Sequence, residues 1–262
     1  AEKIKRLRNA GADGYLGCWI FGGNISVMSK VAGKMSVNPS ITPAHAVRES
    51  AVEEFGQQQS CYVTKAWKMF SSAWKNYPFS IPFLYFSPIN YATAYPLTLD
   101  AKTIPGIPSW LPLPKDKNGH LLTGDNLKVW IAPFSAGFAI KSFRKLLAEW
   151  EIGLEILEKG TINQDSPRYR KELDMAVHIS LLVQSTINII QFYGLLKKYR
   201  KNVPGAKVNL CNLLKKELSI VEQDREIIKR NPDFGYHPEA HTYLIKEEDI
   251  DYKISLLKKY LK

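Results

Sequence analysis

The sequence has few cysteines, and their spacing matches neither a disulfide framework nor a metal site. Cys18, Cys61 and Cys211 are odd in number and far apart, and no CxxC pair occurs among the 262 residues. This pattern excludes a disulfide-rich scaffold and a zinc ribbon. Because Cys18 and Cys61 stand among apolar neighbours, we expect both to be small core residues.

Hydrophobic runs suited to a membrane are also lacking. The longest uncharged stretch, residues 76–99, has the length of a bilayer span but contains Pro78, Pro82, Pro88 and Pro96. We therefore expect no transmembrane span. No basic segment followed by an apolar one opens the chain, so a leader peptide is either absent or removed before residue 1, and the compartment stays undetermined.

Motifs of cofactor and nucleophile chemistry are missing too. The sequence contains no nucleophile elbow, no Walker loop and no GxGxxG fingerprint, so we expect no cofactor. His237, Glu239 and His241 lie close together, but Pro238 argues against a helix that presents both imidazoles to one metal ion. We expect no metal site.

The net charge of +11 raises nucleic acid as a partner. A nucleic-acid groove interleaves basic residues with the aromatic side chains on which bases stack. Here the two are separated, since the aromatic middle, residues 78–136, carries four basic and three acidic residues. Solvated helix faces explain the charge more simply, and we expect no nucleic-acid partner.

Apolar periodicity predicts a mainly α protein built as a helical bundle. Thr42 and Pro43 open a helix that Gly56 closes, and apolar side chains mark one face of the next helix, over residues 63–77. Four further helices are predicted, around residues 143–157 and over 167–201, 206–230 and 247–261. The helix from residue 167 is apolar nearly all round, which places it at the centre of the bundle.

Residues 2–35 predict one different unit. A helix over residues 2–10 stops at Gly11, a short aromatic strand follows over residues 14–21, and a glycine turn leads into a helix that ends near Met35. This α-β-α order occurs once, as a remnant β/α unit of the kind found in barrels.

Residues 78–114 contain eight of the 15 prolines, which excludes a long helix or a central strand. The same residues are too rich in aromatics for a solvated linker, so we expect an ordered loop packed on a scaffold, and such loops are often functional. The chain thus divides into residues 1–77, the β/α unit with a helix pair; residues 78–136, a cap; and residues 137–262, a helical bundle.

Aromatic and polar side chains in these loops are the candidate ligand-binding groups. An indole face beside an amide is how a sugar ring is held, with its C–H face on the aromatic ring and its hydroxyls on polar groups. The candidates are Trp19 and Asn24 at the strand exit, Tyr85, Asn90, Tyr91 and Trp110 in the loop, and His237 and Glu239 near the last helix. For Trp19 the alternative is a core residue, and for His237 and Glu239 it is a hydrogen-bonded structural loop.

Three amides of the long helix, Gln184, Asn188 and Gln191, lie on one face. We expect them to pair with neighbouring helices, and a cavity lined by amides is the alternative.

Four segments in order carry a resemblance to a known family. They are GYLGCWIFGGN, FSPINYATAYPL, SWLP with a GD turn before a helix ending in AEWEIGLEIL, and NPDFGYHPEAHTYL. Together they resemble the C-terminal part of uncharacterised proteins related to hexosaminidase-type (β/α)8 glycoside hydrolases. The resemblance implies that residues 14–21 are a late barrel strand, that Trp19 and Asn24 lie at the active-site mouth, and that the other barrel strands lie upstream or in a partner chain.

Hexosaminidase-type enzymes are similar in using adjacent carboxylates, one of them a general acid. The pairs present here, Glu53 with Glu54 and the acids that open the last helix, are better explained as solvated charges. The expected function is that of a C-terminal piece of a glycoside hydrolase, which binds a neutral or N-acetylated sugar but lacks the catalytic pair and is inactive alone. The alternative is a helical module that docks on a protein partner.

Overall fold

The computed structural model describes residues 1–14, 27–106, 115–161, 166–237 and 242–262. These residues form a mainly helical protein, as predicted. The α-helices are α1 (Glu2–Asn9), α2 (Val27–Val37), α3 (Pro43–Ala73), α4 (Ile81–Phe86), α5 (Leu127–Trp130), α6 (Ala136–Lys159), α7 (Pro167–Arg200), α8 (Ala206–Arg230) and α9 (Glu247–Leu261). Short 3-10 helices are η2 (Trp74–Asn76), η3 (Pro88–Tyr91), η4 (Ala101–Thr103) and η5 (Pro232–Gly235), and the strands are β1 (Tyr236–His237) and β2 (Thr242–Tyr243).

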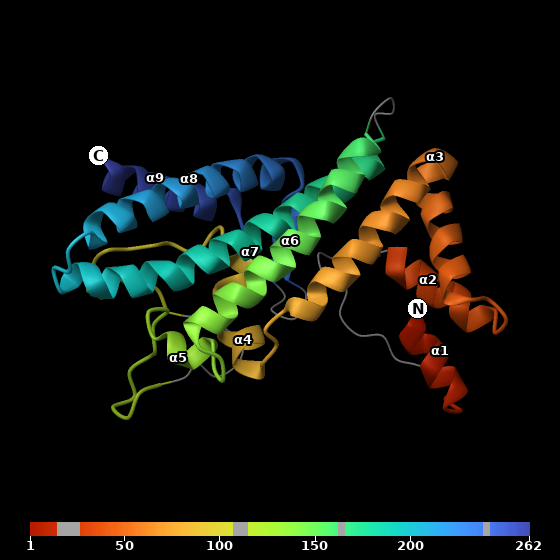
Figure 1. Cartoon of the computed structure of the whole chain (residues 1–262), viewed down its shortest axis with the longest axis horizontal. Helices are drawn as coiled ribbons and strands as arrows, with labels where there is room; N and C mark the ends of the chain where they lie inside the picture. The colour runs from red at the N-terminus through yellow and green to blue at the C-terminus, as the bar shows by residue number, and fades with distance from the viewer. Residues whose placement is uncertain (15–26, 107–114, 162–165, 238–241) are drawn as a thin grey trace.

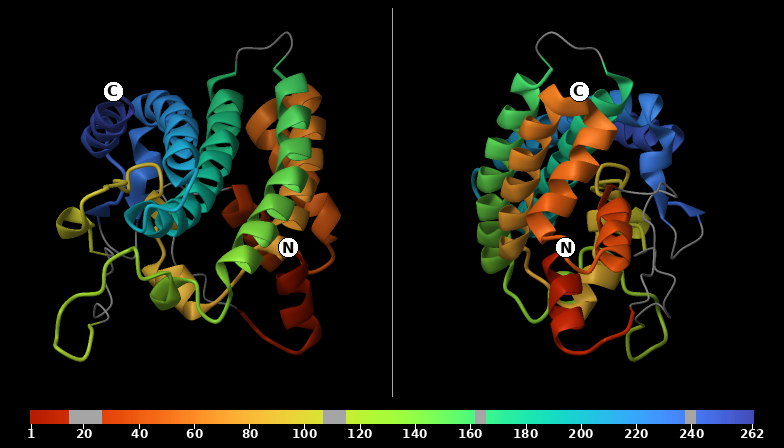
Figure 2. Two further views of the ribbon diagram at one scale, coloured as in Figure 1. Left: turned by 60° about the vertical axis from the view of Figure 1, so that its left-hand side comes forward. Right: turned by 90° about the vertical axis from the view of Figure 1, so that its right-hand side faces the viewer.

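The long helices stand side by side in the order α3, α6, α7, α8, α9 (Figures 1 and 2). Each runs antiparallel to the one before it, so that every helix packs mainly against its neighbours in the chain. This arrangement confirms the predicted helical bundle. Within the described residues, the one sheet is the antiparallel pair β1 and β2, in which Tyr236 lies opposite Tyr243.

Capping residues fix where these helices begin. The hydroxyls of Thr42, Ser135 and Ser166 each accept a hydrogen bond from a backbone N–H in the first turn of α3, α6 and α7. Pro43 and Pro167 follow two of these caps, at positions where the missing N–H costs no helical hydrogen bond. The starts predicted at Pro43 and Pro167 are therefore confirmed.

Gly56 divides α3 into two segments. Its backbone has φ 76° and ψ 167°, a conformation that is essentially restricted to glycine. The chain turns sharply there, and the second segment crosses to pack along α6 (Figure 1). The predicted helix end at Gly56 is thus confirmed, although helical hydrogen bonding resumes directly after it.

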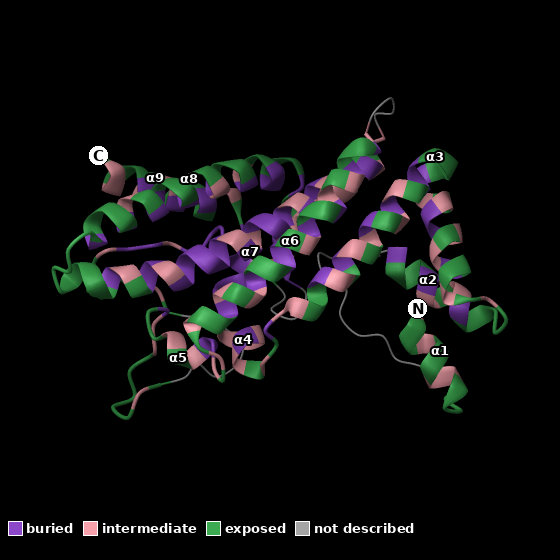
Figure 3. Cartoon of the chain, viewed as in Figure 1, coloured by how far each residue is buried: buried purple, intermediate pink, exposed green. Residues whose placement is uncertain are grey.

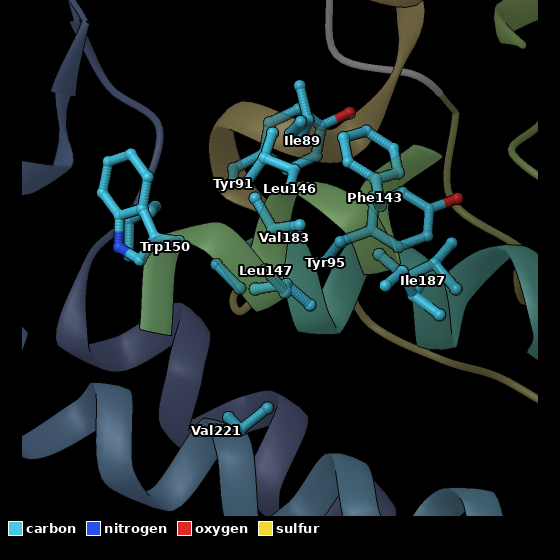
Figure 4. Packing of buried hydrophobic residues seen from close by; sticks show 14 of the residues in the cluster. Ile89, Tyr91, Tyr95, Phe143, Leu146, Leu147, Trp150, Val183, Ile187 and Val221 are labelled. Atoms are coloured by element: carbon cyan, nitrogen blue, oxygen red, sulfur yellow. The ribbon is translucent and has the colours of Figure 1, made fainter. Parts of the chain in front are cut away.

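The proline-rich region is ordered and packs into the core, as expected. Its described residues form only short helices, because Ser80 and Ser87 cap single turns and proline stands at the start of each. Phe83, Tyr95 and Leu97 are almost fully buried. Figure 4 shows Tyr91 and Tyr95 beside Phe143 and Ile187, side chains of α6 and α7.

Helix α7 lies at the centre of the bundle and is buried around much of its middle (Figure 3). Of the described helices, α7 alone has the length and apolar composition of a membrane span, and 67% of its apolar window is buried inside the protein.

One apolar core joins the three predicted regions. The buried cluster runs from Val27 and Phe70 through Phe83 and Tyr95 to Leu257. A second, small cluster of Val31, Met35 and Ala46 holds α2 against the start of α3.

Two sequence predictions need comment. Cys61 is exposed on α3 and is not a core residue, because it lies on the solvent side of a helix whose buried face is occupied by Ser60 and Val63. The predicted strand over residues 14–21, apart from Gly14, lies outside the described residues, and so does Cys18. The two helices predicted on either side of it are present as α1 and α2.

Candidate ligand cavity

A cavity of about 460 Å³ lies between α7, the segment that joins α3 to η3, and the turn after α8. Its walls are mostly apolar, and three polar side chains reach it. The lining residues are Trp74, Tyr77, Leu84, Ile89, Asn90, Met175, His178, Ile179, Leu182, Val183, Phe234, Gly235, Tyr236 and His237. An apolar pocket with a few convergent polar groups is the usual form of a small-molecule site.

Aromatic rings form one wall of the cavity. Trp74 and Tyr77 lie with their ring centroids 5.4 Å apart, and Trp74 meets Trp150 edge to face at 5.8 Å. Burial raises the pKa of Tyr77 far above its ordinary value, so its hydroxyl stays neutral. Trp74 remains 42% exposed and therefore lies at the rim of the cavity.

The opposite wall depends on a glycine. The backbone C=O of Gly235 accepts hydrogen bonds from the N–H groups of Leu244 and Ile245. A Cβ at position 235 would lie 1.9 Å from the carbonyl oxygen of Ile245, which no side chain can tolerate without a shift of the backbone. This close approach sets Phe234, Tyr236 and His237 against the cavity.

Three polar side chains converge on the cavity, and they come from three separate elements. Asn90 lies in η3, His178 in α7 and His237 in β1. The residues that line the cavity in the described part of the chain include no Lys, Arg, Asp or Glu. Because an ion would find no counter-charge on these walls, the lining favours an uncharged ligand.

His178 is held by a buried carboxylate. Its Nδ1 donates a hydrogen bond of 2.6 Å to Oδ1 of Asp224 on α8, and the two side chains are 3% and 0% exposed. The imidazole also lies against the ring of Phe234, with centroids 5.8 Å apart. The ring orientation is thus fixed from two sides.

A buried ion pair lies near this hydrogen bond. Nζ of Lys253 on α9 is 2.5 Å from Oε1 of Glu217 on α8, and both side chains are fully buried. Lys253 also donates to the carbonyl oxygen of Ala92, and the amide of Asn188 donates to Glu217 at 2.8 Å. Burial lowers the pKa of Lys253 despite the opposing effect of Glu217. Asp224 adds to that opposing effect, so the two pairs interact electrostatically.

The structure brings two of the predicted site residues together. Asn90 and His237, far apart in sequence, both line the cavity. Tyr85 is partly buried and does not line it. Tyr91 is buried in the core against Tyr95, and its hydroxyl has no hydrogen-bond partner among the described residues.

The four other predicted site residues, Trp19, Asn24, Trp110 and Glu239, lie outside the described residues, so their assignment stays a prediction.

Sequence reasoning missed several residues of the cavity. Trp74 and Tyr77 belong to the apolar face predicted over residues 63–77, but their spacing does not reveal that they lie just after α3 and line a cavity. His178 gave a usable signal, because it is a titratable side chain within an otherwise apolar helix. The sequence does not identify Asp224 as its partner, because neither helix specifies how the two helices align along each other.

The three aligned amides of α7 have different surroundings. Asn188 pairs across to α8 through Glu217, as expected for a structural amide. Gln184 donates to Ser180 within α7. Gln191 lines a different, basic hollow of about 640 Å³ beside Lys141, Arg144 and Lys145.

A larger hollow of about 720 Å³ lies near the end of α7. This hollow is more open than the aromatic-walled cavity. Charged residues of both signs line it, including Asp116, Asp125, Lys197, Arg200 and Lys201. Because two carboxylates and three cationic side chains are mixed in this lining, it does not single out an anion or a cation as ligand.

Among the described residues, no group of three or more potential metal ligands is close enough to hold a metal ion. Comparison with protein-family models, with curated proteins and with solved structures found no match for this chain.

Proposed function

We propose that this chain binds a neutral small molecule with an apolar ring face in the cavity between α7 and η5, and that its ligand class is a saccharide or an aryl glycoside. The observation that carries the proposal is the convergence of Asn90 and His237 on one aromatic-walled cavity. Both residues are candidate sugar-binding groups by their chemistry and their place in the sequence.

The lining suits such a ligand in two respects. The rings of Trp74, Tyr77 and Tyr236 offer faces for the C–H side of a pyranose or for an aryl group. The side chains of Asn90 and His178 offer hydrogen bonds to hydroxyls, and the described lining, which contains no Lys, Arg, Asp or Glu, disfavours ionic ligands.

Binding rather than hydrolysis is proposed because the described lining contains no carboxylate pair. In this proposal the chain supplies binding groups to a glycoside-hydrolase-like protein whose general acid lies elsewhere.

The experiment is a calorimetric titration of the purified chain with glucose, N-acetylglucosamine and their p-nitrophenyl glycosides. We expect saturable binding that is tightest for the aryl glycosides. Leu182→Trp fills the cavity and should weaken binding by about tenfold or more, equivalent to ~1.4 kcal/mol. Val208→Trp is the control, because Val208 is 63% exposed on α8 and does not line the cavity.

The proposal fails if no ligand binds at millimolar concentration, or if both tryptophan variants bind as well as the wild type while circular dichroism shows them folded. Release of p-nitrophenol by the wild-type chain would contradict the expectation that the chain alone lacks hydrolase activity.

A second candidate function, docking on a protein partner, is favoured by exposed apolar side chains beside α4 and at the start of α6. Phe79, Ile81 and Phe138 are 61%, 57% and 51% exposed. Light scattering on the titration samples separates the two, since self-association without ligand binding would favour docking.

A further inference from the structure

His178 is held in place by a hydrogen bond and has one ring nitrogen left for a ligand. Its Nδ1 is occupied by Asp224 at 2.6 Å. Because His178 lines the cavity and makes no other hydrogen bond within the described residues, Nε2 is the atom that can meet a ligand.

The surroundings of Asp224 strengthen this arrangement. Asp224 is fully buried, and its Oδ2 has no hydrogen-bond partner among the described residues. The carboxylate therefore directs its hydrogen bonding to His178 alone, and with Phe234 packed on the ring the imidazole has little freedom to turn. An anchor held in this way loses little entropy when a ligand binds to it.

We propose that His178 anchors the ligand of this cavity through a hydrogen bond between Nε2 and a ring hydroxyl, and that Asp224 is the residue that positions it. The inference rests on the proposed function and deepens it, because it names the group by which the ligand is selected. A hydroxyl suits the site in either protonation state of the imidazole, since it can donate to a bare Nε2 and accept from a protonated one.

The aromatic walls define where the rest of the ligand lies. Met175, Ile179 and Leu182 lie with His178 on the cavity side of α7, and Phe234 and Tyr236 also line the cavity. A ligand whose hydroxyl meets Nε2 therefore buries its ring among apolar side chains. The selected class is a hydroxylated ring, whether a sugar or a phenolic group.

The test uses phenol and toluene, two probes of the same shape that differ in the hydroxyl. In an apolar cavity toluene binds better, because phenol loses its hydrogen bonds to water without replacement. We expect the wild-type chain to favour phenol, as measured by ligand-observed NMR titration. The ratio of phenol to toluene affinity should fall by about tenfold or more in His178→Leu.

Two further variants separate anchoring from folding. The double variant His178→Leu with Asp224→Leu removes the buried carboxylate together with its partner, so it should stay folded if His178→Leu alone does not. It should bind toluene and lose the preference for phenol. His178→Gln can place an amide near the position of Nε2 and should keep part of the preference.

The outcomes are distinct. A phenol preference that is unchanged in the folded double variant would overturn the role of His178 and leave the proposed cavity function intact. If the wild-type chain binds toluene more tightly than phenol, the anchoring role of His178 is likewise overturned, and the proposed cavity function stands. Failure of both probes and of the aryl glycosides to bind would overturn the cavity function itself.

Discussion

At the scale of single residues, the pair of fully buried charges Lys253 and Glu217 is the unusual feature of the described core. Lys253 and Glu217 are fully buried, and each has further hydrogen-bond partners, the carbonyl of Ala92 for Lys253 and Asn188 for Glu217. Burying two charges costs several kcal/mol per ion, which their attraction and hydrogen bonds must offset. The pair ties α8 and α9 to the turn after η3.

Lys253→Met should therefore destabilise the protein by about 3–5 kcal/mol, because it leaves the carboxylate of Glu217 buried without a counter-charge. Adding Glu217→Gln should restore much of the lost stability, since the buried charge is then gone. Urea denaturation measures both effects.

Lys258→Met is the matched control. It removes a lysine from the same helix, but from a pair with Glu222 that is about half exposed. We expect Lys258→Met to lower the free energy of unfolding by less than about 1 kcal/mol. Equal losses at Lys253 and Lys258 would show that the buried pair contributes no more than a surface one.

At the scale of elements, the bend in α3 decides how the N-terminal helices meet the bundle. Gly56 adopts a backbone conformation with φ 76° that other residues avoid, although a Cβ there would have open space around it. Replacing Gly56 should therefore lower stability through backbone strain, and not through a steric clash with a neighbouring residue.

Gly56→Ala should destabilise the protein by about 1–3 kcal/mol, because alanine must either adopt the strained conformation or straighten the helix. Gly33→Ala in α2 is the control, since Gly33 is helical and also has open space around it. There alanine should stabilise by up to about 1 kcal/mol. Thermal unfolding compares the two variants, and effects of the same sign would contradict the assignment of the bend to Gly56.

The element scale is also where sequence prediction succeeded best. The helices α8 and α9 have the predicted bounds, and α7 begins at the predicted Pro167. Hydrophobic periodicity and capping residues are local signals, and helix formation responds to local signals.

At the scale of the whole molecule, one continuous core joins α3 to α9, whereas α1 stands apart. Helix α1 has no buried residue, and its closest partner is α2. Helix α7, by contrast, has its whole middle section buried between neighbours on both sides.

The backbone amide hydrogens of α1 should accordingly be among the fastest in the protein to exchange with solvent. Those in the middle of α7 should be among the slowest. Hydrogen exchange followed by mass spectrometry measures this order. Protection of α1 equal to that of α7 would show that α1 packs on the bundle in solution.

The candidate site could be predicted only in part. Asn90 and His237 were found because amide, imidazole and aromatic side chains in an ordered loop are typical of ligand sites, and both line the cavity. Tyr91 was selected by the same rule but lies in the core, because an aromatic ring in a packed loop serves burial as readily as binding. Asp224 was not found, since its role depends on which side chain of α7 it meets.

By itself the sequence determined most of the long helices, several of their ends, and the burial of the proline-rich loop, because each follows from short-range geometry or from the local density of apolar side chains. The tertiary structure alone decided the cavity and its fixed imidazole. An apolar face specifies that a helix must be covered, but not which neighbour covers it or at what register. The meeting of Asn90, His178 and His237 is therefore a property of packing between distant segments.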